Sequence, residues 1–241
     1  MTTWTNESAI RRWSVAAEES LRATSHSGDF AKRNLINPAL FRLLGDLHGR
    51  RVLDAGCGNG YLSRMLADRG ATVVGVEPGR DAFDFAVARE AEEPRGIRYV
   101  QADLSFLPDL GEPFDAVVTS MVLQVIPEWQ AAMRSCVAAL APGGLFVFTL
   151  NHPSFEQLAT VWRAHGEYRT GRYLSEYTIE GPSGADFHRP LSAYLNETAR
   201  LGCRLVEVVE PGLDPSTVDV PGGCESYMEL PNFVIVAAEA S

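Results

Sequence analysis

The chain has 241 residues, of which 46% are hydrophobic and 22% charged, as in an ordinary soluble globular protein. Its formal net charge of −10 argues against a general binder of nucleic acid or anionic lipid, since phosphate groups attract basic surfaces. No secretory pattern opens the chain, and no run approaches the roughly eighteen apolar residues of a membrane helix. We therefore expect a cytoplasmic protein of one domain, without nucleic-acid or membrane partners.

The four cysteines, Cys57, Cys136, Cys203 and Cys224, lie far apart in the sequence. None belongs to a C-x-x-C pair, and none has a histidine at metal-binding spacing. We expect reduced thiols, buried at Cys136 and Cys203, and neither a metal site nor a disulfide framework.

The first 48 residues are predicted to form a helical cap. Residues 7–22 carry apolar side chains at helical spacing, which indicates one amphipathic helix. A second helical stretch over 30–47 contains Pro38. Because proline removes a helix hydrogen bond, we expect two short helices that meet near Asn37.

From Arg51 onward, short apolar runs alternate with helical patterns. This alternation predicts right-handed βαβ units and a parallel sheet with helices on both faces. The expected strands are 52–54, 72–76, 97–101, 114–119 and 145–150, and the expected helices are 62–69, a segment ending at about residue 92, and 129–140.

Residues 151–190 break this rhythm and are rich in aromatic residues and glycine turns. Their length and composition favour a lid or a substrate-facing insertion over a bare linker. A helix over 191–201 then leads to two final strands, 205–209 and 233–237, which we expect to pair antiparallel.

The most informative stretch is Asp54-Ala55-Gly56-Cys57-Gly58-Asn59-Gly60, which predicts a strand, a tight turn and the start of a helix. Glycines permit backbone angles that are closed to other residues and allow a ligand close to the main chain. The helix start is expected to present free N–H groups there. In open parallel sheets, ligands lie across the carboxyl ends of the strands, so this turn predicts a nucleotide-type site.

The spacing of the glycines and of the acids that follow them narrows the choice of ligand. The turn reads G-x-G-x-G, with Tyr61 where the third glycine of a dinucleotide fingerprint would stand, and the Walker lysine is absent. Glu77 ends the second strand, 23 positions after Asp54, where an acid would accept hydrogen bonds from ribose hydroxyls. Asp103 ends the third strand, where it could reach an adenine amino group. These residues predict an adenosine-containing ligand other than NAD or ATP.

Four ordered motifs between about residues 50 and 152 resemble those of class I S-adenosylmethionine-dependent methyltransferases: VLDAGCGNGYLSRMLADRGATVVGVEPG, YVQADLSFLP, FDAVVTSMVLQVIP and LAPGGLFVFTLNHP. The resemblance implies a three-layer, doubly wound α/β fold. Its mostly parallel sheet would have seven strands in the order 3-2-1-4-5-7-6, with strand 7 antiparallel. It also implies S-adenosylmethionine as the cofactor and S-adenosylhomocysteine as the product.

The same resemblance implies the cofactor contacts. The segments GDFAKRNLINPALFRLLGDLHGRRVLD, NHPSF and HRPLSAYLNETARLGC resemble the cap and the substrate-side segments of a bacterial small-molecule branch of the family. The implied contacts are Arg33 with the cofactor carboxylate; Asp54, Gly56, Cys57, Gly58, Asn59 and Gly60 along the methionine part; Glu77 and Pro78 at the ribose; Asp103 and Leu104 at the adenine; and Ser120 and Met121 at the methionine end.

Two histidines are candidates for a general base, because an imidazole titrates near neutral pH. His152 follows the fifth strand, and His188 precedes the helix over 191–201. The alternative for each is a structural role in orienting a loop. The candidates for contact with the acceptor are His152 and the aromatic residues Trp13, Trp162, Tyr168 and Tyr173, whose ring faces also attract a sulfonium cation.

The predicted function is methyl transfer to a small, partly apolar acceptor in secondary metabolism, with oxygen slightly preferred over nitrogen or carbon. We expect a monomer or homodimer whose single domain comprises a cap (1–48), a cofactor-binding core (49–150), an insertion (151–190) and a C-terminal part (191–241). Two alternatives stay open. A protein or RNA methyltransferase is disfavoured by the charge and by the lack of an N-P-P-Y-type signature, and an enzyme could also bind the cofactor without methylating.

Overall fold

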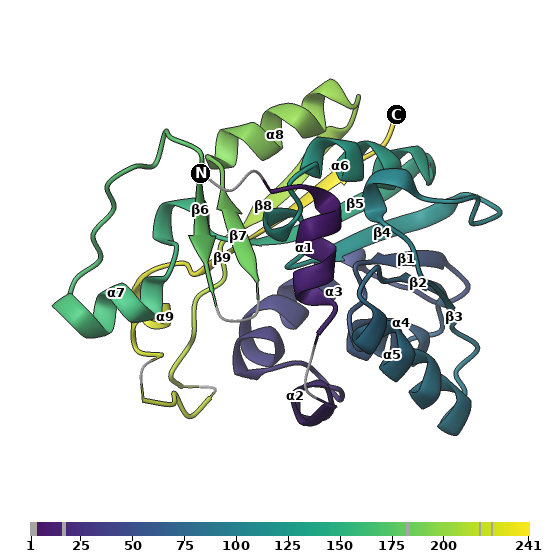
Figure 1. Ribbon diagram of the computed structural model, residues 1–241, viewed down its shortest axis with the longest axis horizontal. Helices are drawn as coiled ribbons and strands as arrows, with labels where there is room; N and C mark the ends of the chain where they lie inside the picture. The colour runs from purple at the N-terminus through teal and green to yellow at the C-terminus, as the bar shows by residue number, and fades with distance from the viewer. Residues whose placement is uncertain (1–3, 16–17, 182–183, 217, 223) are drawn as a thin grey trace.

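The structure is a computed structural model that describes residues 4–15, 18–181, 184–216, 218–222 and 224–241. Its central sheet has seven strands in the order β3-β2-β1-β4-β5-β9-β8, and β6 and β7 form a separate hairpin. Helices cover both faces of the sheet (Figure 1). Since β8 and β9 are the sixth and seventh strands of this sheet, the predicted order 3-2-1-4-5-7-6 is confirmed.

The strands fall into a parallel part and an antiparallel part. β9 runs antiparallel to both of its neighbours, β5 and β8, so the predicted pairing of the last two strands is also confirmed. The parallel part consists of β1 (Arg51–Ala55), β2 (Thr72–Val76), β3 (Arg98–Val100), β4 (Phe114–Ser120) and β5 (Leu140–Asn151). The antiparallel pair consists of β8 (Arg204–Val209) and β9 (Phe233–Glu239).

Two apolar clusters hold the helices to the sheet. One face packs against α3 (Asn37–Leu44) and α4 (Tyr61–Ala67). The other face packs against α6 (Trp129–Ala138) and α8 (Leu191–Arg200). The parallel strands are buried on both sides, which explains their nearly continuous apolar sequences. A further helix, α5 (Arg80–Glu92), follows β2.

The cap differs from its prediction in one respect. Instead of one helix over 7–22 there are two, α1 (Asn6–Trp13) and α2 (Glu18–Ala23), with residues 16 and 17 outside the described part. At the end of α1 the Ser14 hydroxyl donates to the carbonyl of Ile10 at 2.7 Å, and such side-chain bonds compete with helix continuation.

The second helical stretch agrees with its prediction at Asn37. A π-helical segment, η1 (Lys32–Ile36), changes there into α3. The backbone stays helical through this change because Pro38 lies in the first turn of α3, where its missing N–H costs little.

The insertion after β5 has its own elements: η4 (Pro153–Phe155), α7 (Leu158–His165), β6 (Tyr177–Glu180) and β7 (Ala185–His188). The β6–β7 hairpin was not predicted. Figure 1 shows it beside α1, and the contact includes a hydrogen bond from the Arg12 guanidinium to the carbonyl of Gly181 at 3.2 Å. The Trp4 and Phe187 rings also meet edge to face, with centroids 5.9 Å apart. The cap and the insertion therefore meet over the core.

Candidate functional site

A cavity of about 510 Å³ lies at the carboxyl ends of the central strands, below α1. This is the edge at which open α/β sheets bind ligands. Its wall includes Trp13 and most of the predicted cofactor contacts: Gly56, Cys57, Gly58, Asn59, Glu77, Pro78, Asp103, Leu104, Ser120 and Met121. We call it the cofactor cavity.

The glycine turn between β1 and α4 has the predicted strained backbone. Gly56, Gly58 and Gly60 have φ angles of 84°, 56° and 76°. A side chain on Gly56 would collide with Val122, and one on Gly60 with the Tyr99 hydroxyl. Gly60 therefore packs against the protein interior rather than on the cavity wall.

The backbone amides of this turn are already bonded within the protein. Gly56 and Cys57 donate to the carbonyl of Val76 at 2.8 and 2.9 Å, and Gly60 donates to the carbonyl of Cys57. Gly58 donates to Glu77 Oε2 at 2.9 Å. These four amides of the turn are therefore not free for a ligand, and the turn cannot bind a phosphate as a P-loop does.

Glu77 stands at the end of β2, where the sequence predicted a ribose-binding acid. Its carboxylate accepts hydrogen bonds from the amides of Gly58 and Gly79, at 2.9 and 2.7 Å. Burial raises the pKa of Glu77, and the two amide bonds oppose that shift. One bond is made to each oxygen, so both oxygens keep capacity to accept a bond from a ligand.

Asp54 lies below the turn rather than on the cavity wall, which differs from its predicted contact with the methionine part. The side chain is 1% exposed and accepts a hydrogen bond from the Ser63 hydroxyl of α4 at 2.6 Å. Burial raises its pKa to about 7, opposed by the bond from Ser63 and reinforced by the charge of Glu77.

Asp103 meets a residue that the sequence analysis did not select. The side-chain amide nitrogen of Asn6, in α1, donates to both carboxylate oxygens of Asp103, at 3.2 and 3.0 Å. Asn6 is 97 positions away in the chain, and no sequence motif marks it.

The cation on the cavity wall is Lys32, not Arg33. Lys32 lines the cavity, with its ammonium 5.4 Å from the centre of the Tyr61 ring, whereas Arg33 is exposed and does not line it. Both residues belong to the π-helical segment η1, in which successive side chains project in different directions. The place on the cavity wall that the sequence analysis gave to Arg33 is therefore taken by Lys32.

Met121 follows β4 with a φ of 62°, a left-handed conformation that is unusual for a residue other than glycine. Its amide donates to both the carbonyl and the hydroxyl of Thr149 on β5, at 3.1 and 3.0 Å. These bonds hold the strained residue in place between the ends of β4 and β5. Strain of this kind concentrates at functional sites.

His152 does not face the cofactor cavity. Its Nδ1 accepts a hydrogen bond from the Ser154 amide at 3.1 Å, and its Nε2 lies 2.7 Å from the Glu210 carboxylate. Because Nδ1 accepts, the proton belongs on Nε2 and is donated to Glu210. Both nitrogens are engaged by neighbouring groups, as the loop-orienting alternative for His152 requires.

His188 is 0% exposed and forms a buried pair with Glu156. Its Nε2 lies 2.8 Å from the carbonyl of Tyr173 and must therefore carry a hydrogen. Its Nδ1 lies 2.8 Å from Glu156 Oε2, a separation that requires one proton between the two groups. His188 lines neither the cofactor cavity nor the smaller cavity that holds Glu156, so the structure does not bring it to a substrate as a direct base.

A second cavity of about 200 Å³ lies at the carboxyl end of β5. Its wall combines carboxyl, amide and apolar groups, and we call it the acceptor-side cavity. Burial raises the pKa of both of its acids, Glu156 and Asp186. The lining residues are Asn151, Glu156, Gln157, Leu158, Thr160, Ile179, Asp186, Tyr227 and Asn232.

The aromatic residues predicted to contact the acceptor do not lie together in one cavity. Trp13 lines the cofactor cavity. The Tyr168 hydroxyl donates to the Glu156 carbonyl at 3.2 Å, and the Tyr173 hydroxyl accepts from the Leu191 amide at 3.1 Å. Tyr168 and Tyr173 therefore support the wall around Glu156, and neither they nor Trp162 lines either cavity.

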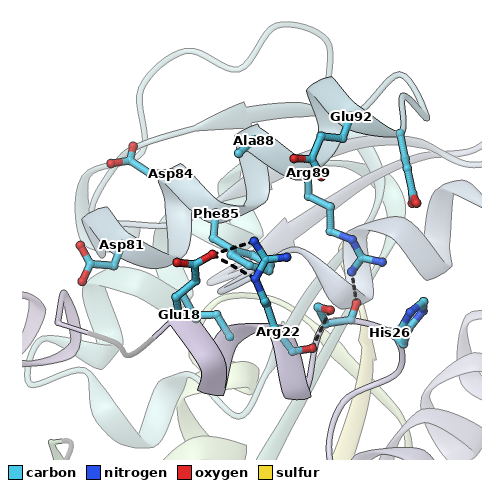
Figure 2. A pocket seen from close by; sticks show the side chains of 12 residues that line it. Glu18, Arg22, His26, Asp81, Asp84, Phe85, Ala88, Arg89 and Glu92 are labelled. Carbon is cyan, nitrogen blue, oxygen red and sulfur yellow. Dashed lines mark hydrogen bonds and ion pairs between the residues drawn. The ribbon is translucent and has the colours of Figure 1, made fainter.

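Another hollow, of about 720 Å³, lies between α2 and α5 (Figure 2). Both of its arginines already have partners: Arg22 pairs with Glu18 at 2.6 Å and also lies over the Phe85 ring, and Arg89 donates to the Ser25 carbonyl. This hollow is where α2 docks on α5, and it lacks the strand-end position of a ligand site.

Two further findings concern the described residues only. They contain no group of three or more histidine, cysteine or acidic side chains that could hold a metal ion. None of their helices is long and apolar enough to cross a membrane.

Comparisons with known proteins agree with this geometry. Residues 52–144 match the family model described as a methyltransferase domain. An S-adenosylmethionine-dependent methyltransferase from Mesorhizobium loti is 28% identical, with a TM-score of 0.73 over 84% of this chain and 96% of that one. Residues 52–144 are thus matched as a methyltransferase domain, and the chain as a whole is similar to class I S-adenosylmethionine-dependent methyltransferases. Its cofactor is S-adenosylmethionine.

Curated relatives of this methyltransferase match over part of their length. Ubiquinone biosynthesis O-methyltransferase of Coxiella burnetii is 32% identical over 139 residues, which are 56% of this chain and 59% of that protein. The enzyme of the same name from Alkalilimnicola ehrlichii is 39% identical over 110 residues, 45% of this chain and 44% of that protein. The chain thus spans about half the length of the curated relatives that it matches.

A structural neighbour with a different activity limits what the fold alone implies for this chain. The [4+2]-cyclase SpnF has a TM-score of 0.67 and 17% identity over 100% of this chain and 98% of that one. This likeness concerns the fold only.

The cofactor cavity of this methyltransferase fits S-adenosylmethionine. The turn amides are bonded internally and leave no phosphate cradle, while Glu77 and Asp103 offer acceptors. Such a wall suits a ligand with hydroxyl, amino and cationic groups. Lys32 supplies the positive charge that a ligand carboxylate, such as that of the methionine part of the cofactor, requires.

Proposed function

We propose that this methyltransferase transfers a methyl group to a hydroxyl oxygen of a small acceptor bound in the acceptor-side cavity. The observation that carries the proposal is the placement of two cavities at the carboxyl ends of adjacent strands, β4 and β5. Met121 lines the cofactor cavity and packs against the same apolar cluster as Tyr227, which lines the acceptor-side cavity. The curated relatives are named as O-methyltransferases, which supports oxygen as the methylated atom.

The proposed cofactor contacts follow from the cavity wall. Glu77 would accept bonds from the ribose hydroxyls, and Asp103 with Leu104 would bind the adenine. Lys32 would pair with the cofactor carboxylate, and Met121 with Ser120 would contact the methionine end. S-adenosylmethionine supplies an electrophilic methyl group on a sulfonium cation. The protein therefore has mainly to align the acceptor with the C–S bond and to exclude water.

The proposed proton acceptor is Asp186. The Glu156–His188 pair already holds a proton, so its carboxylate is poorly placed to take another from a substrate. Asp186 lines the same cavity, and its Oδ2 accepts a hydrogen bond from the Asn151 amide at 3.0 Å. Burial raises the pKa of Asp186, which brings the carboxylate closer to the basicity that proton transfer at neutral pH needs.

The acceptor-side cavity suggests a small acceptor with polar groups. Its volume of about 200 Å³ lies below the range typical of drug-sized ligand sites. Ile179, Leu158 and Tyr227 offer apolar contacts on one part of the wall, while amides and carboxyls form the rest. We infer a role in small-molecule biosynthesis, as in secondary metabolism.

The test has two steps. Calorimetric titration with S-adenosylhomocysteine should show binding to the wild-type chain. Incubation with S-adenosylmethionine and a panel of small phenols, catechols, hydroxy acids and amines should then release S-adenosylhomocysteine only when an acceptor is present. Asp186→Asn should lower kcat on a hydroxyl acceptor by roughly 100-fold or more. The matched control Asp84→Asn removes an exposed acid of α5 and should leave kcat unchanged.

The result also separates the alternatives. Cofactor binding without S-adenosylhomocysteine release on any acceptor would favour an enzyme that binds the cofactor and does not methylate. Transfer of label into bulk protein or tRNA, with none into small molecules, would replace the small-molecule acceptor. Full activity of Asp186→Asn on a hydroxyl acceptor would remove Asp186 from the mechanism and leave the rest of the proposal standing.

A further inference from the structure

We propose that Asn6 is a positioning residue that orients the Asp103 carboxylate toward the adenine amino group, and that it thereby makes the cofactor cavity selective for a 6-amino purine over a 6-oxo purine. The inference rests on the proposed role of Asp103 in the function above. It adds a residue of α1 that lies outside the matched methyltransferase domain, residues 52–144.

The Asn6 side chain is 7% exposed, and both ends of its amide are used. Its nitrogen donates to Asp103 Oδ1 and Oδ2 and to the Ser105 hydroxyl at 2.7 Å. Its oxygen accepts from the Glu128 amide at 2.9 Å. Since a backbone N–H only donates, the oxygen must face Glu128 and the nitrogen must face the carboxylate. The orientation of the amide is therefore fixed by its partners.

These bonds join three segments around one edge of the cofactor cavity: α1, the loop after β3 with η2 (Leu104–Phe106), and the loop before α6. Asn6, Asp103 and Leu104 all line that edge. Truncating Asn6 would leave the segments in place through their other contacts, but Asp103 would lose its only side-chain donor among the described residues.

The two carboxylate oxygens of Asp103 differ in the number of hydrogen bonds that they accept. Oδ1 accepts from Asn6 and from the Ser105 amide at 2.9 Å, whereas Oδ2 accepts from Asn6 alone. Each carboxylate oxygen can accept about two bonds, so Oδ2 keeps a free acceptor position. An exocyclic amino group donates into that position. The carbonyl oxygen of a 6-oxo purine would instead bring a second acceptor against the carboxylate, and an unpaired buried polar group is costly.

The experiment compares two probes that differ at this one group, S-adenosylhomocysteine and S-inosylhomocysteine. Calorimetry should give a wild-type preference for the adenosyl probe of roughly 100-fold. Asn6→Ala should reduce that preference about 10-fold, mainly by weakening the adenosyl probe. Asp103→Asn should bring the preference close to one, because an amide at position 103 can rotate to donate to the oxo group.

Two controls separate positioning from general support. Ser8→Ala alters the same helix through its cap, where Ser8 and Thr5 exchange hydrogen bonds, and leaves Asp103 untouched. It should preserve the preference even if it lowers Tm. Asn6→Ser, a smaller polar variant, serves if Asn6→Ala folds poorly, and should give an intermediate preference.

The outcomes are distinct. An Asn6→Ala chain that loses affinity for both probes equally, so that their ratio is unchanged, overturns the inference and makes Asn6 merely structural. An unchanged ratio in Asp103→Asn overturns it as well. A wild-type chain that binds neither probe contradicts the proposed function instead. Binding is measured with no acceptor present, so failure of methyl transfer leaves the inference standing.

Discussion

Replacing Asp54 by asparagine should change how the stability of the fold depends on pH. The ordinary pKa of an aspartate, 3.8, is raised to about 7 here, mainly by burial. The folded chain therefore binds this proton more tightly than the unfolded chain. The stabilisation from the protonated form is complete below the unfolded pKa and is lost as the pH rises through about 7.

The size of the effect follows from the shift. When the pKa of Asp54 is about 3 units higher in the folded chain, the wild type loses about 4 kcal/mol of unfolding free energy as the pH rises from below the unfolded pKa to above the folded pKa. Roughly 2 kcal/mol of that loss falls between pH 5.5 and pH 8. Asp54→Asn cannot titrate, so its unfolding free energy minus that of the wild type should grow by that amount between the two pH values. An amide hydrogen left without a partner costs about 1–3 kcal/mol at every pH and does not affect this difference.

The assay is urea unfolding of both chains at pH 5.5 and pH 8, with Asp84→Asn as the control for removal of one acid. Glu77, whose pKa is also raised, is present in all three chains, so its own burial contributes equally to each, and only its charge interaction with Asp54 is lost in Asp54→Asn. A stability difference between Asp54→Asn and the wild type that is the same at both pH values would refute the reasoning. It would mean that Asp54 is solvated or paired in the folded chain.

Three further outcomes test the site and its support. Lys32→Met should raise the Kd of S-adenosylhomocysteine about 5- to 10-fold by calorimetry, whereas Arg33→Met should change it less than about twofold; equal effects would contradict the placement of Lys32 on the wall. Arg64→Met should lower the unfolding free energy by about 3–5 kcal/mol, because buried Arg64 pairs with Glu90 at 3.1 Å and its loss leaves that carboxylate unpaired. Gly56→Ala should lower the unfolding free energy by more than about 1 kcal/mol and weaken cofactor binding, because the φ of 84° at this position suits glycine alone. Unchanged cofactor affinity would show that binding does not depend on this turn conformation.

The core of the fold was predictable because its signals are local. Short apolar runs that end in an acid or a glycine mark the parallel strands, and the spacing of Gly56, Glu77 and Asp103 depends only on strand ends that converge at one edge. The sheet order came from the family resemblance. The same local logic failed for the helix over 7–22, which the Ser14 hydroxyl interrupts through its bond to Ile10.

The candidate site was less predictable where side-chain direction decides. Arg33 and Lys32 are neighbours in sequence, and only the π-helical geometry determines which one reaches the cavity. His152 and His188 follow or precede the expected elements, yet each has both nitrogens committed to nearby groups. A sequence shows that an imidazole is present but not which bonds it has already made.

Contacts between distant segments could not be predicted from one sequence. Asn6 reaches Asp103 across 97 positions, and Asp186 joins Glu156 in one cavity only because the β6–β7 hairpin forms. Of these residues, only Asp103 stands in a motif. Their roles depend on how the cap and the insertion fold back over the core.

The position of α1 has a consequence for how relatives of this chain can diverge. The glycine turn lies within the family match, but the opposite wall of the cofactor cavity, with Asn6, Ile10 and Trp13, lies in the first 13 residues. Substitutions in those residues can alter cofactor affinity and selectivity while every shared motif stays intact. A shortened chain that began after Trp13 would keep the whole family match and lose the wall of the cofactor cavity that α1 forms.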